Sequence, residues 1–475
     1  MLVRDLGIRR WGGRATKPGC FVRAFTWALL LSGSASSATA ESPVGWRQDT
    51  SGVFSAASPP SEWSAEDSLI WKNAEAGGSN SSAISVGDRV FVCAEPTRLL
   101  CLAAADGRLL WEHQHNYDLV LSESEWQAAQ QDLAQAETIR QGLIEVREEA
   151  GELDQQLQDK PDDAELQNRR DALQAKLDAA ELELAPLEKY RIPERSAGCT
   201  TATPLCDGER VYAVFGTGIV VCYNLNGERQ WIRLLEKPAL DWGHTASPLL
   251  AGDSLVVHIT ELTALNMQTG EVRWTSDVQP SYGSPVACRI GAADAILTAA
   301  GDLVALADGA VLAEGIAEPL QRSSPVVADG IAYFVEVAAC AVRLTGDDSP
   351  GAKAETLWET KLHEDNYYAS PLVRDGLVYT VSEGRMLAVL DAASGEIVYE
   401  ELLRFEERGA VVSSLAAAGD FIYVTNEAGG TKVLRAGREY DEVAENPLAP
   451  LRGSLHFADG RLFARTLQGV YCIGE

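Results

Sequence analysis

The chain has 475 residues and a formal net charge of −29 at neutral pH, with 40 Lys and Arg against 69 Asp and Glu. This length allows two or three ordinary domains or one large repeat array. The negative charge argues against a nucleic-acid partner or an anionic membrane surface, because phosphate groups would repel the protein. A surface of this kind commonly serves only to keep a protein in solution.

The first 40 residues have the order of an export signal. A basic stretch precedes the apolar run Ala24–Leu31, and Ala38-Thr39-Ala40 suits cleavage after small residues. That run is too short to span a membrane as a helix, and no later stretch approaches about 18 uninterrupted apolar residues. We therefore expect residues 1–40 to be a signal peptide and the mature protein to be soluble and periplasmic or extracellular. Arg9-Arg10 leaves the export route open between the general and twin-arginine systems.

The rest of the chain contains eight copies of one pattern. A small polar residue leads into an apolar strand, and a turn rich in Gly and Asp separates it from a second strand. Apart from the first interval, successive copies begin 37 to 46 residues apart. This is the period of a propeller blade built from four short strands. The copies begin at Ser82, Thr203, Ser247, Ser284, Ser324, Ser370, Ser414 and Ser454.

A closed ring is predicted by the two ends of the repeat array. The last copy reaches Glu475 without room for a fourth strand, whereas Leu69–Lys72 reads as a lone strand ahead of the first copy. If this strand completes the last blade, the ring closes and leaves no open sheet edge. We therefore predict an all-β fold, an eight-bladed β-propeller over residues 41–121 and 191–475. A count of seven, with one degenerate blade, is the alternative.

The first interval is too long for a blade and carries a helical pattern. Between about Glu123 and Lys189 apolar residues recur in three- and four-residue steps, and 159–162, Asp-Lys-Pro-Asp, divides them into two helices with proline at the start of the second. We predict an antiparallel coiled-coil hairpin inserted at residues 122–190. A helix of about 30 residues would extend on the order of 45 Å. The hairpin is either a spacer or a docking arm for a protein partner.

Eight cysteines remain after the proposed cleavage, and most lie at small buried strand positions. Cys101 precedes Gly107 by six residues, as Ala264 precedes Gly270. A free cysteine packs at such a position as a small apolar residue. Structural packing is therefore the main prediction. Cys93 with Cys101, on neighbouring strands, is the first disulfide to examine.

The best-kept copy, Ser247–Trp274, reads SPLLAGDSLVVHITELTALNMQTGEVRW and resembles the pyrroloquinoline-quinone (PQQ) propeller repeat. This resemblance covers the mature chain apart from the hairpin. The same repeat builds quinoprotein dehydrogenases and non-catalytic propellers such as the lipoprotein of the outer-membrane β-barrel assembly machinery. The resemblance implies the fold, and in both groups it implies that the repeat tryptophans are wedges between blades. It leaves the activity open.

A quinoprotein dehydrogenase of this family would carry two adjacent cysteines, calcium ligands and an aspartate base. No Cys-Cys pair occurs here; Asp241 is a candidate acid and Asp365-Asn366 a candidate ligand pair. We assign no catalytic, cofactor-binding or metal-binding residues and expect no cofactor, with PQQ and calcium required only under the dehydrogenase alternative. The leading hypothesis is an exported, non-enzymatic scaffold that binds a protein partner through the propeller face and the hairpin.

Loops that lead into the first strand of each blade meet around the channel on one face of a propeller. Here they carry aromatic and basic side chains, which suit recognition of a peptide or a sugar. Alternatively, the rings simply plug the channel mouth. The candidate binding residues are Trp242, His244, Tyr282, Arg322, Tyr367, Tyr368, Arg408 and Arg452, with Asn80 and Arg195 beside them.

Overall fold

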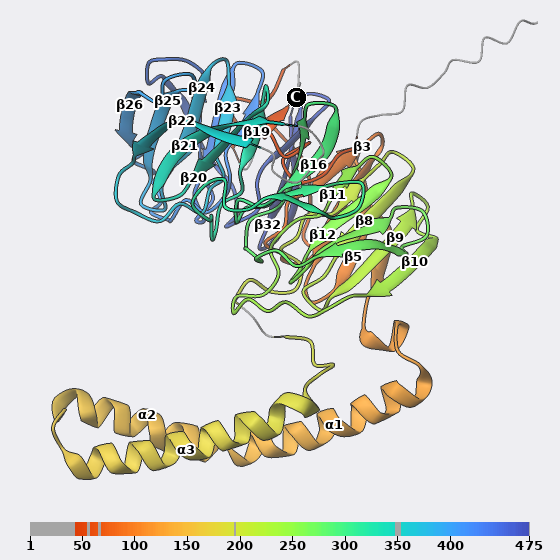
Figure 1. Cartoon of the computed structure of the whole chain (residues 1–475), viewed down its shortest axis with the longest axis vertical. Coiled ribbons are helices and arrows are strands. Elements are labelled where there is room, and N and C mark those ends of the chain that lie inside the picture. The colour runs from red at the N-terminus through yellow and green to blue at the C-terminus, as the bar shows by residue number, and fades with distance from the viewer. Residues whose placement is uncertain (1–42, 55–57, 65–67, 194–195, 347–352, 475) are drawn as a thin grey trace, which may run out of the picture. The chain divides into compact units, whose positions relative to one another are not determined.

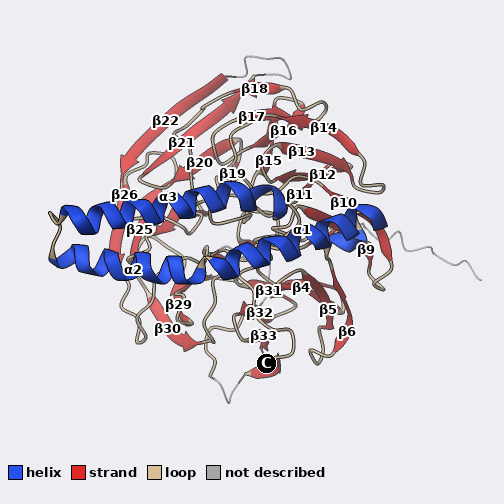
Figure 2. Cartoon of the chain, turned by 90° about the horizontal axis from the view of Figure 1, so that it is seen from below, coloured by secondary structure: helices blue, strands red, loops and turns tan. Residues whose placement is uncertain are grey.

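A computed structural model describes residues 43–54, 58–64, 68–193, 196–346 and 353–474. Its strands form eight sheets arranged as a ring (Figure 1; Figure 2). The prediction of eight blades is confirmed, and the alternative of seven is wrong. The predicted signal peptide, residues 1–40, lies outside the described residues.

The first four blades follow the order of the chain. Blade 1 has β3 (Ile84–Val86), β4 (Arg89–Ala94), β5 (Arg98–Ala103) and β6 (Leu109–Gln114); blade 2 has β7 (Leu205–Cys206), β8 (Arg210–Val214), β9 (Ile219–Asn224) and β10 (Arg229–Leu234); blade 3 has β11 (Leu249–Ala251), β12 (Ser254–His258), β13 (Leu262–Asn266) and β14 (Val272–Ser276); blade 4 has β15 (Val286–Ile290), β16 (Ala293–Leu297), β17 (Leu303–Ala305) and β18 (Val311–Ala313).

The last four blades include the two strands from the N-terminal region. Blade 5 has β19 (Val326–Ala328), β20 (Ile331–Val335), β21 (Ala338–Thr345) and β22 (Lys353–Lys361); blade 6 has β23 (Leu372–Arg374), β24 (Leu377–Val381), β25 (Met386–Asp391) and β26 (Ile397–Leu402); blade 7 has β27 (Ala416–Ala418), β28 (Phe421–Thr425), β29 (Gly430–Arg435) and β30 (Glu442–Pro447) with β1 (Val53–Phe54); blade 8 has β31 (His456–Ala458), β32 (Arg461–Thr466) and β33 (Gly469–Ile473) with β2 (Leu69–Asn73).

The ring closes by pairing the two ends of the chain. Strand β2 runs antiparallel to β33, with Leu69 opposite Ile473 and Trp71 opposite Cys472. This confirms the prediction that the lone N-terminal strand completes the last blade. Because β2 covers the free edge of β33, the two chain ends hold each other and β33 is not left as an open edge.

Hydroxyl groups link the blades around the channel. In seven of the eight blades, the small polar residue that begins the blade accepts a hydrogen bond from the backbone N–H of its counterpart in the preceding blade, over 2.8–3.0 Å. The bond from Ser454 N–H to Ser82 Oγ joins blade 8 to blade 1. We call this set the hydroxyl ring; its members are Ser82, Thr203, Ser247, Ser284, Ser324, Ser370, Ser414 and Ser454.

A tryptophan on the outer strand of one blade packs against a turn glycine of the next. The Trp358 ring lies over Gly395, and its Nε1–H donates to the Ala392 carbonyl over 3.0 Å. The same arrangement pairs Trp71 with Gly107, Trp111 with Gly227, Trp231 with Gly270 and Trp274 with Gly309. These glycines have positive φ, so each provides both the turn conformation and a flat surface for the indole. The tryptophans are wedges, as the resemblance implied.

The eight cysteines among the described residues are free thiols. Cys93 and Cys101 lie on neighbouring strands but oppose Leu99 and Phe91 respectively, so the register separates them and the disulfide alternative is not formed. Cys101, Cys222 and Cys472 each oppose a wedge tryptophan, where a small side chain leaves room for the indole. Cys340, by contrast, is partly exposed.

The inserted segment forms α1 (Glu123–Gly142), α2 (Ile144–Asp159) and α3 (Ala164–Leu187), after the short 3₁₀ turn η1 (Tyr117–Leu119). The predicted first helix is therefore two, with a break at Leu143. Salt bridges from Arg140 to Glu188 and from Arg169 to Glu149 show that α3 runs antiparallel to the first two. No helix among the described residues is long and apolar enough to span a bilayer.

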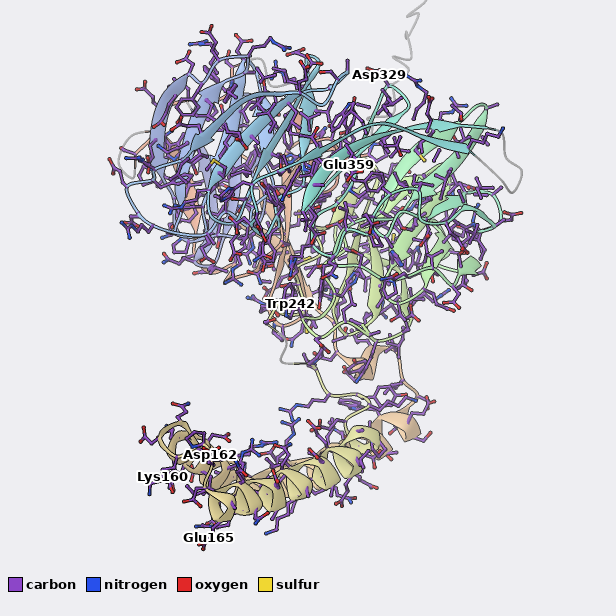
Figure 3. All side chains as sticks on the ribbon, turned by 60° about the vertical axis from the view of Figure 1, so that its left-hand side comes forward. Lys160, Asp162, Glu165, Trp242, Asp329 and Glu359 are labelled. Carbon is purple, nitrogen blue, oxygen red and sulfur yellow. The ribbon has the colours of Figure 1, made fainter. Side chains whose placement is uncertain are left out.

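Side chains at the helix starts explain where the helices begin. Ser122 and Glu125 form a reciprocal capping box at the start of α1. The Asp163 carboxylate caps α3, so Pro161 lies before the helix, within the connecting turn. The prediction that this proline begins the helix is therefore wrong. Lys160, Asp162 and Glu165 mark this turn at the tip of the helix pair (Figure 3).

Candidate functional site

A cavity of about 460 Å³ opens where the loops before the first strands meet. Five of the eight predicted binding residues line it: Trp242, Tyr282, Arg322, Tyr368 and Arg452. Asn80 also lines it, and its amide Nδ2 donates to the Ala197 carbonyl over 2.9 Å. The hydroxyl ring forms the inner wall of the same cavity.

Three aromatic rings and one guanidinium form a stack at the mouth. The Trp242 and Tyr282 rings are 4.8 Å apart and nearly parallel, and Tyr368 follows at 6.3 Å from Trp242. The Arg322 guanidinium lies over both Trp242 and Tyr368, at 5.9 and 5.4 Å from the ring centres. Trp242 remains 38% exposed on the loop before β11, where Figure 3 labels it. The stack therefore presents an aromatic surface without filling the mouth.

The two arginines of the cavity already have carboxylate partners. Arg322 Nη1 donates to Glu336 Oε1 over 3.0 Å, and Arg452 Nη2 donates to Glu427 Oε2 over 3.3 Å. The first pair is mostly buried and orients Arg322 over the rings, whereas the second is half exposed and contributes little to stability. Two of the four arginines predicted for this face therefore line the cavity, and each is paired with a carboxylate.

The remaining predicted residues lie outside the cavity wall. His244 is buried, and burial lowers the pKa of its imidazole to about 3. Tyr367 is fully buried, with its hydroxyl donating to the His363 carbonyl over 3.2 Å. Arg408 is exposed and away from the cavity lining, and Arg195 lies outside the described residues. Neighbouring positions in one loop thus face opposite ways, which residue type alone does not reveal.

The floor of the cavity comes from a segment that sequence reasoning missed. Residues 43–54, which we call the channel loop, begin beside blade 2, where Val44 and Cys206 exchange backbone hydrogen bonds of 2.8 Å. They end as β1, which runs parallel to β27 in blade 7. Between these points Trp46 lines the cavity and Arg47 is buried. The channel loop crosses from one blade to another, and only its Gly and Trp content set it apart in the sequence.

The candidate dehydrogenase residues serve turns instead of a shared site. Asp365 Oδ2 accepts from Gly384 N over 2.7 Å, and Asn366 Nδ2 donates to Glu383 Oε2 over 2.9 Å. Asp241 is exposed on the loop before blade 3. No cysteine lines the cavity, and the described residues contain no group of three His, Cys, Asp or Glu placed to hold a metal ion.

The family described as outer membrane protein assembly factor BamB matches residues 189–336 and 349–475. The match covers more than half of the chain and spans blades 2 to 8. The chain belongs to this family. The crystal structure of BamB from Moraxella catarrhalis has a TM-score of 0.52 at 12% identity, over 83% of this chain and 93% of that one.

A second solved structure gives a similar result. The computationally designed Ika8 protein has a TM-score of 0.52 at 10% identity, over 86% of this chain and all of that one. No curated protein matches this chain. At these identities the structural likeness to BamB and Ika8 concerns the fold alone.

Proposed function

We propose that this BamB-family propeller is an exported, non-enzymatic scaffold that binds a polypeptide partner at the cavity mouth. The observation that carries the proposal is the stack of Trp242, Tyr282 and Tyr368 under Arg322. Large rigid aromatics and arginine are the residue types that most often dominate protein–protein binding energy. Because Arg322 is held by Glu336, the stack is preorganised and little side-chain entropy would be lost on binding.

The family membership supports the same class of function. The family's description names an assembly factor of outer membrane proteins. The partners of such a factor are polypeptides. The basic, apolar and small-residue order of residues 1–40 supports export to the periplasm or the exterior. Edman or mass analysis of the mature N-terminus tests export, and a chain that retains residues 1–40 would contradict it.

The helical hairpin is proposed as a second contact for a protein partner. Its arms bury a narrow seam of apolar residues. Ala150, Leu153 and Leu173 form one cluster in it, and Ala129, Ala136, Ala180 and Leu184 are also buried. Most of its remaining surface is exposed and acidic, and Leu182 is an apolar side chain left 80% exposed on α3. Such a surface suits a partner with basic groups and a small apolar pocket.

Site-specific photocrosslinking in the native host tests the proposed cavity-mouth contact. A crosslinking residue in place of Trp242 should capture a discrete protein adduct, because this side chain is the exposed member of the stack. The matched control is Val337, which is 67% exposed on the turn between β20 and β21 and does not line the cavity. Equal capture from both positions would overturn the proposal.

The alternative, a PQQ-dependent dehydrogenase, would need carboxylate and amide ligands for calcium beside the quinone. The cavity fits that group poorly: Glu427 is paired with Arg452, and Glu383 with Asn366. Titration with PQQ and calcium, followed by dye-linked alcohol oxidation, separates the two functions. Stoichiometric binding of PQQ together with alcohol oxidation would contradict the scaffold proposal and support the dehydrogenase.

A further inference from the structure

Arg47 is a buried cation that forms no salt bridge with any described residue, although Asp49 attracts it electrostatically. Its side chain is 2% exposed, and Nη2 donates to the carbonyls of Pro371 and Leu415 over 2.8 and 3.2 Å. Within the described part of the chain, Nε and Nη1 have no hydrogen-bond partner. The nearest acid in the sequence, Asp49, is exposed, and its Oδ1 accepts from the backbone N–H and the hydroxyl of Ser51. A buried charge of this kind is costly unless something pairs with it.

The hydroxyl ring lies directly beside this cation. Pro371 and Leu415, which accept from Arg47, immediately follow the ring members Ser370 and Ser414. The ring oxygens accept backbone N–H groups, so each such hydroxyl has its hydrogen left to donate. The ring residues line the cavity, and all of them except Ser414 are nearly completely buried.

We propose that the channel binds a compact oxyanion, a phosphate or carboxylate group, within the hydroxyl ring and close to Arg47. Hydroxyl donors converging from several blades match the several acceptor oxygens of such a group, and Arg47 provides the opposite charge. The two observations are independent, because the ring belongs to the repeats and Arg47 to the channel loop. The proposal concerns a small ligand and stands apart from polypeptide binding at the mouth.

The mouth of the cavity is compatible with an anion despite the acidity of the whole chain. Its two carboxylates, Glu383 and Glu427, are engaged by Asn366 and Arg452. Arg322 adds a cation above the ring, and its partner Glu336 does not line the cavity. A cavity of about 460 Å³ holds a phosphate group with water, or the terminal carboxylate of a short peptide.

Calorimetric titration of the mature protein with inorganic phosphate tests the site. We expect saturable binding of one equivalent, with a change in tryptophan fluorescence because Trp46 lines the cavity beside Arg47. Removing a charge-assisted hydrogen bond typically weakens binding about ten-fold or more, so Arg47→Gln should do so. Arg408→Gln, at an exposed arginine away from the cavity, is the matched control and should leave binding unchanged.

Two further titrations identify the source of the anion. A tripeptide with a free carboxyl terminus, compared with its amidated form, distinguishes a peptide carboxylate from a free phosphate. Binding of either phosphate or the free-acid peptide, lost in Arg47→Gln, supports the proposal. Absence of saturable binding of both to the unaltered protein, or equal binding by Arg47→Gln and Arg408→Gln, overturns it. The titrations of the unaltered protein decide the matter even if Arg47→Gln folds poorly.

Discussion

At the scale of single residues, contact with a wedge tryptophan explains why a glycine is needed at the turn on which the indole packs. A β-carbon at Gly395 would lie 2.5 Å from the Trp358 ring, closer than any side chain tolerates. The glycine pattern was visible in the sequence, and a positive φ was the expected reason for it. The second reason, contact with the preceding blade, was not visible, because the contact joins residues 37 positions apart.

This second role predicts unequal effects of one substitution at two similar turns of blade 6. Gly376 and Gly395 have φ values of 74° and 73°, but a β-carbon at Gly376 would meet nothing within 4 Å. Gly376→Ala should cost about 1 kcal/mol from the left-handed backbone alone. Gly395→Ala adds the clash with Trp358 and should cost on the order of 3 kcal/mol or more. Urea unfolding measures both; equal losses would contradict the wedge role of Gly395.

Buried histidines predict a loss of stability in mild acid. Burial lowers the pKa values of His115, His258 and His456 to about 4, and His456 Nε2 accepts the Ser85 N–H, which only the neutral ring can do. Because these folded pKa values lie below the unfolded value of about 6.5, the unfolded chain binds more protons between pH 6.5 and 4. The free energy of unfolding should therefore fall as pH falls through this window, by up to about 1.4 kcal/mol per pH unit for each histidine.

Urea unfolding at pH 7.5, 6.5 and 5.5 measures this slope. His456→Gln should flatten it, because glutamine keeps a hydrogen-bond acceptor but does not titrate. The exposed His363 provides the control, since His363→Gln should leave the slope unchanged. A His456→Gln slope equal to that of the unaltered protein would contradict the assignment.

At the scale of elements, strands were easier to predict than the segment that crosses the channel. Each blade strand repeats a pattern seen in seven other copies, and β2 was found because blade 8 lacked a strand. The channel loop has no counterpart in the repeat, so nothing in the sequence indicated that Trp46 and Arg47 lie under the cavity. Similarly, the three- and four-residue steps between apolar residues predicted the helices. They did not predict the break at Leu143, because the steps continue across it with little change.

The helical hairpin should be separable from the propeller only beyond its base. Near the base, Trp126 and Tyr190 pack against the apolar core shared by blades 1 and 2, and Arg140 pairs with Glu188. Deleting residues 147–181, with a short Gly-Ser turn in their place, removes the distal helices and keeps these contacts. The unfolding free energy of the propeller should change by less than about 0.5 kcal/mol, as for surface changes.

The matched control deletes residues 123–189 and so removes Trp126 as well. Loss of a fully buried aromatic side chain commonly costs about 3–5 kcal/mol of unfolding free energy. Because Trp126 is only half-buried, its removal should cost roughly 1–3 kcal/mol. Circular dichroism and urea unfolding measure both deletions. A large loss of stability on removal of 147–181 alone would show that the distal helices pack as part of the core.

At the scale of the whole molecule, the sequence predicted the architecture well and the site in part. Period, turn glycines and the missing strand were enough for eight blades and for ring closure. Trp242, Tyr282, Arg322, Tyr368 and Arg452 were placed at the cavity because the loops before first strands must converge in a propeller. His244, Tyr367 and Arg408 do not line the cavity, because the direction of a side chain within a loop depends on packing that the pattern does not encode.

Because β2 closes the ring by pairing with β33, removing β2 should open it. A chain that begins at residue 74 lacks β2 and leaves β33 unpaired, so it should self-associate through this edge or lose cooperative unfolding. A chain that begins at residue 58 lacks the channel loop but keeps β2, and should remain a closed ring. Light scattering coupled to size exclusion and urea unfolding compare the two chains.

Complementation distinguishes loss of the edge strand from general damage. A synthetic peptide of residues 68–74 carries Trp71, whose indole packs on Gly107 and donates to the Ala104 carbonyl. Added to the chain that begins at residue 74, it should restore the unfolding transition in a concentration-dependent way, because binding to the folded state alone raises stability by mass action. The same peptide with Trp71→Ala should restore much less. If both peptides act equally, or the shortened chain is already as stable as the chain from residue 58, pairing of the chain ends does not hold the ring closed.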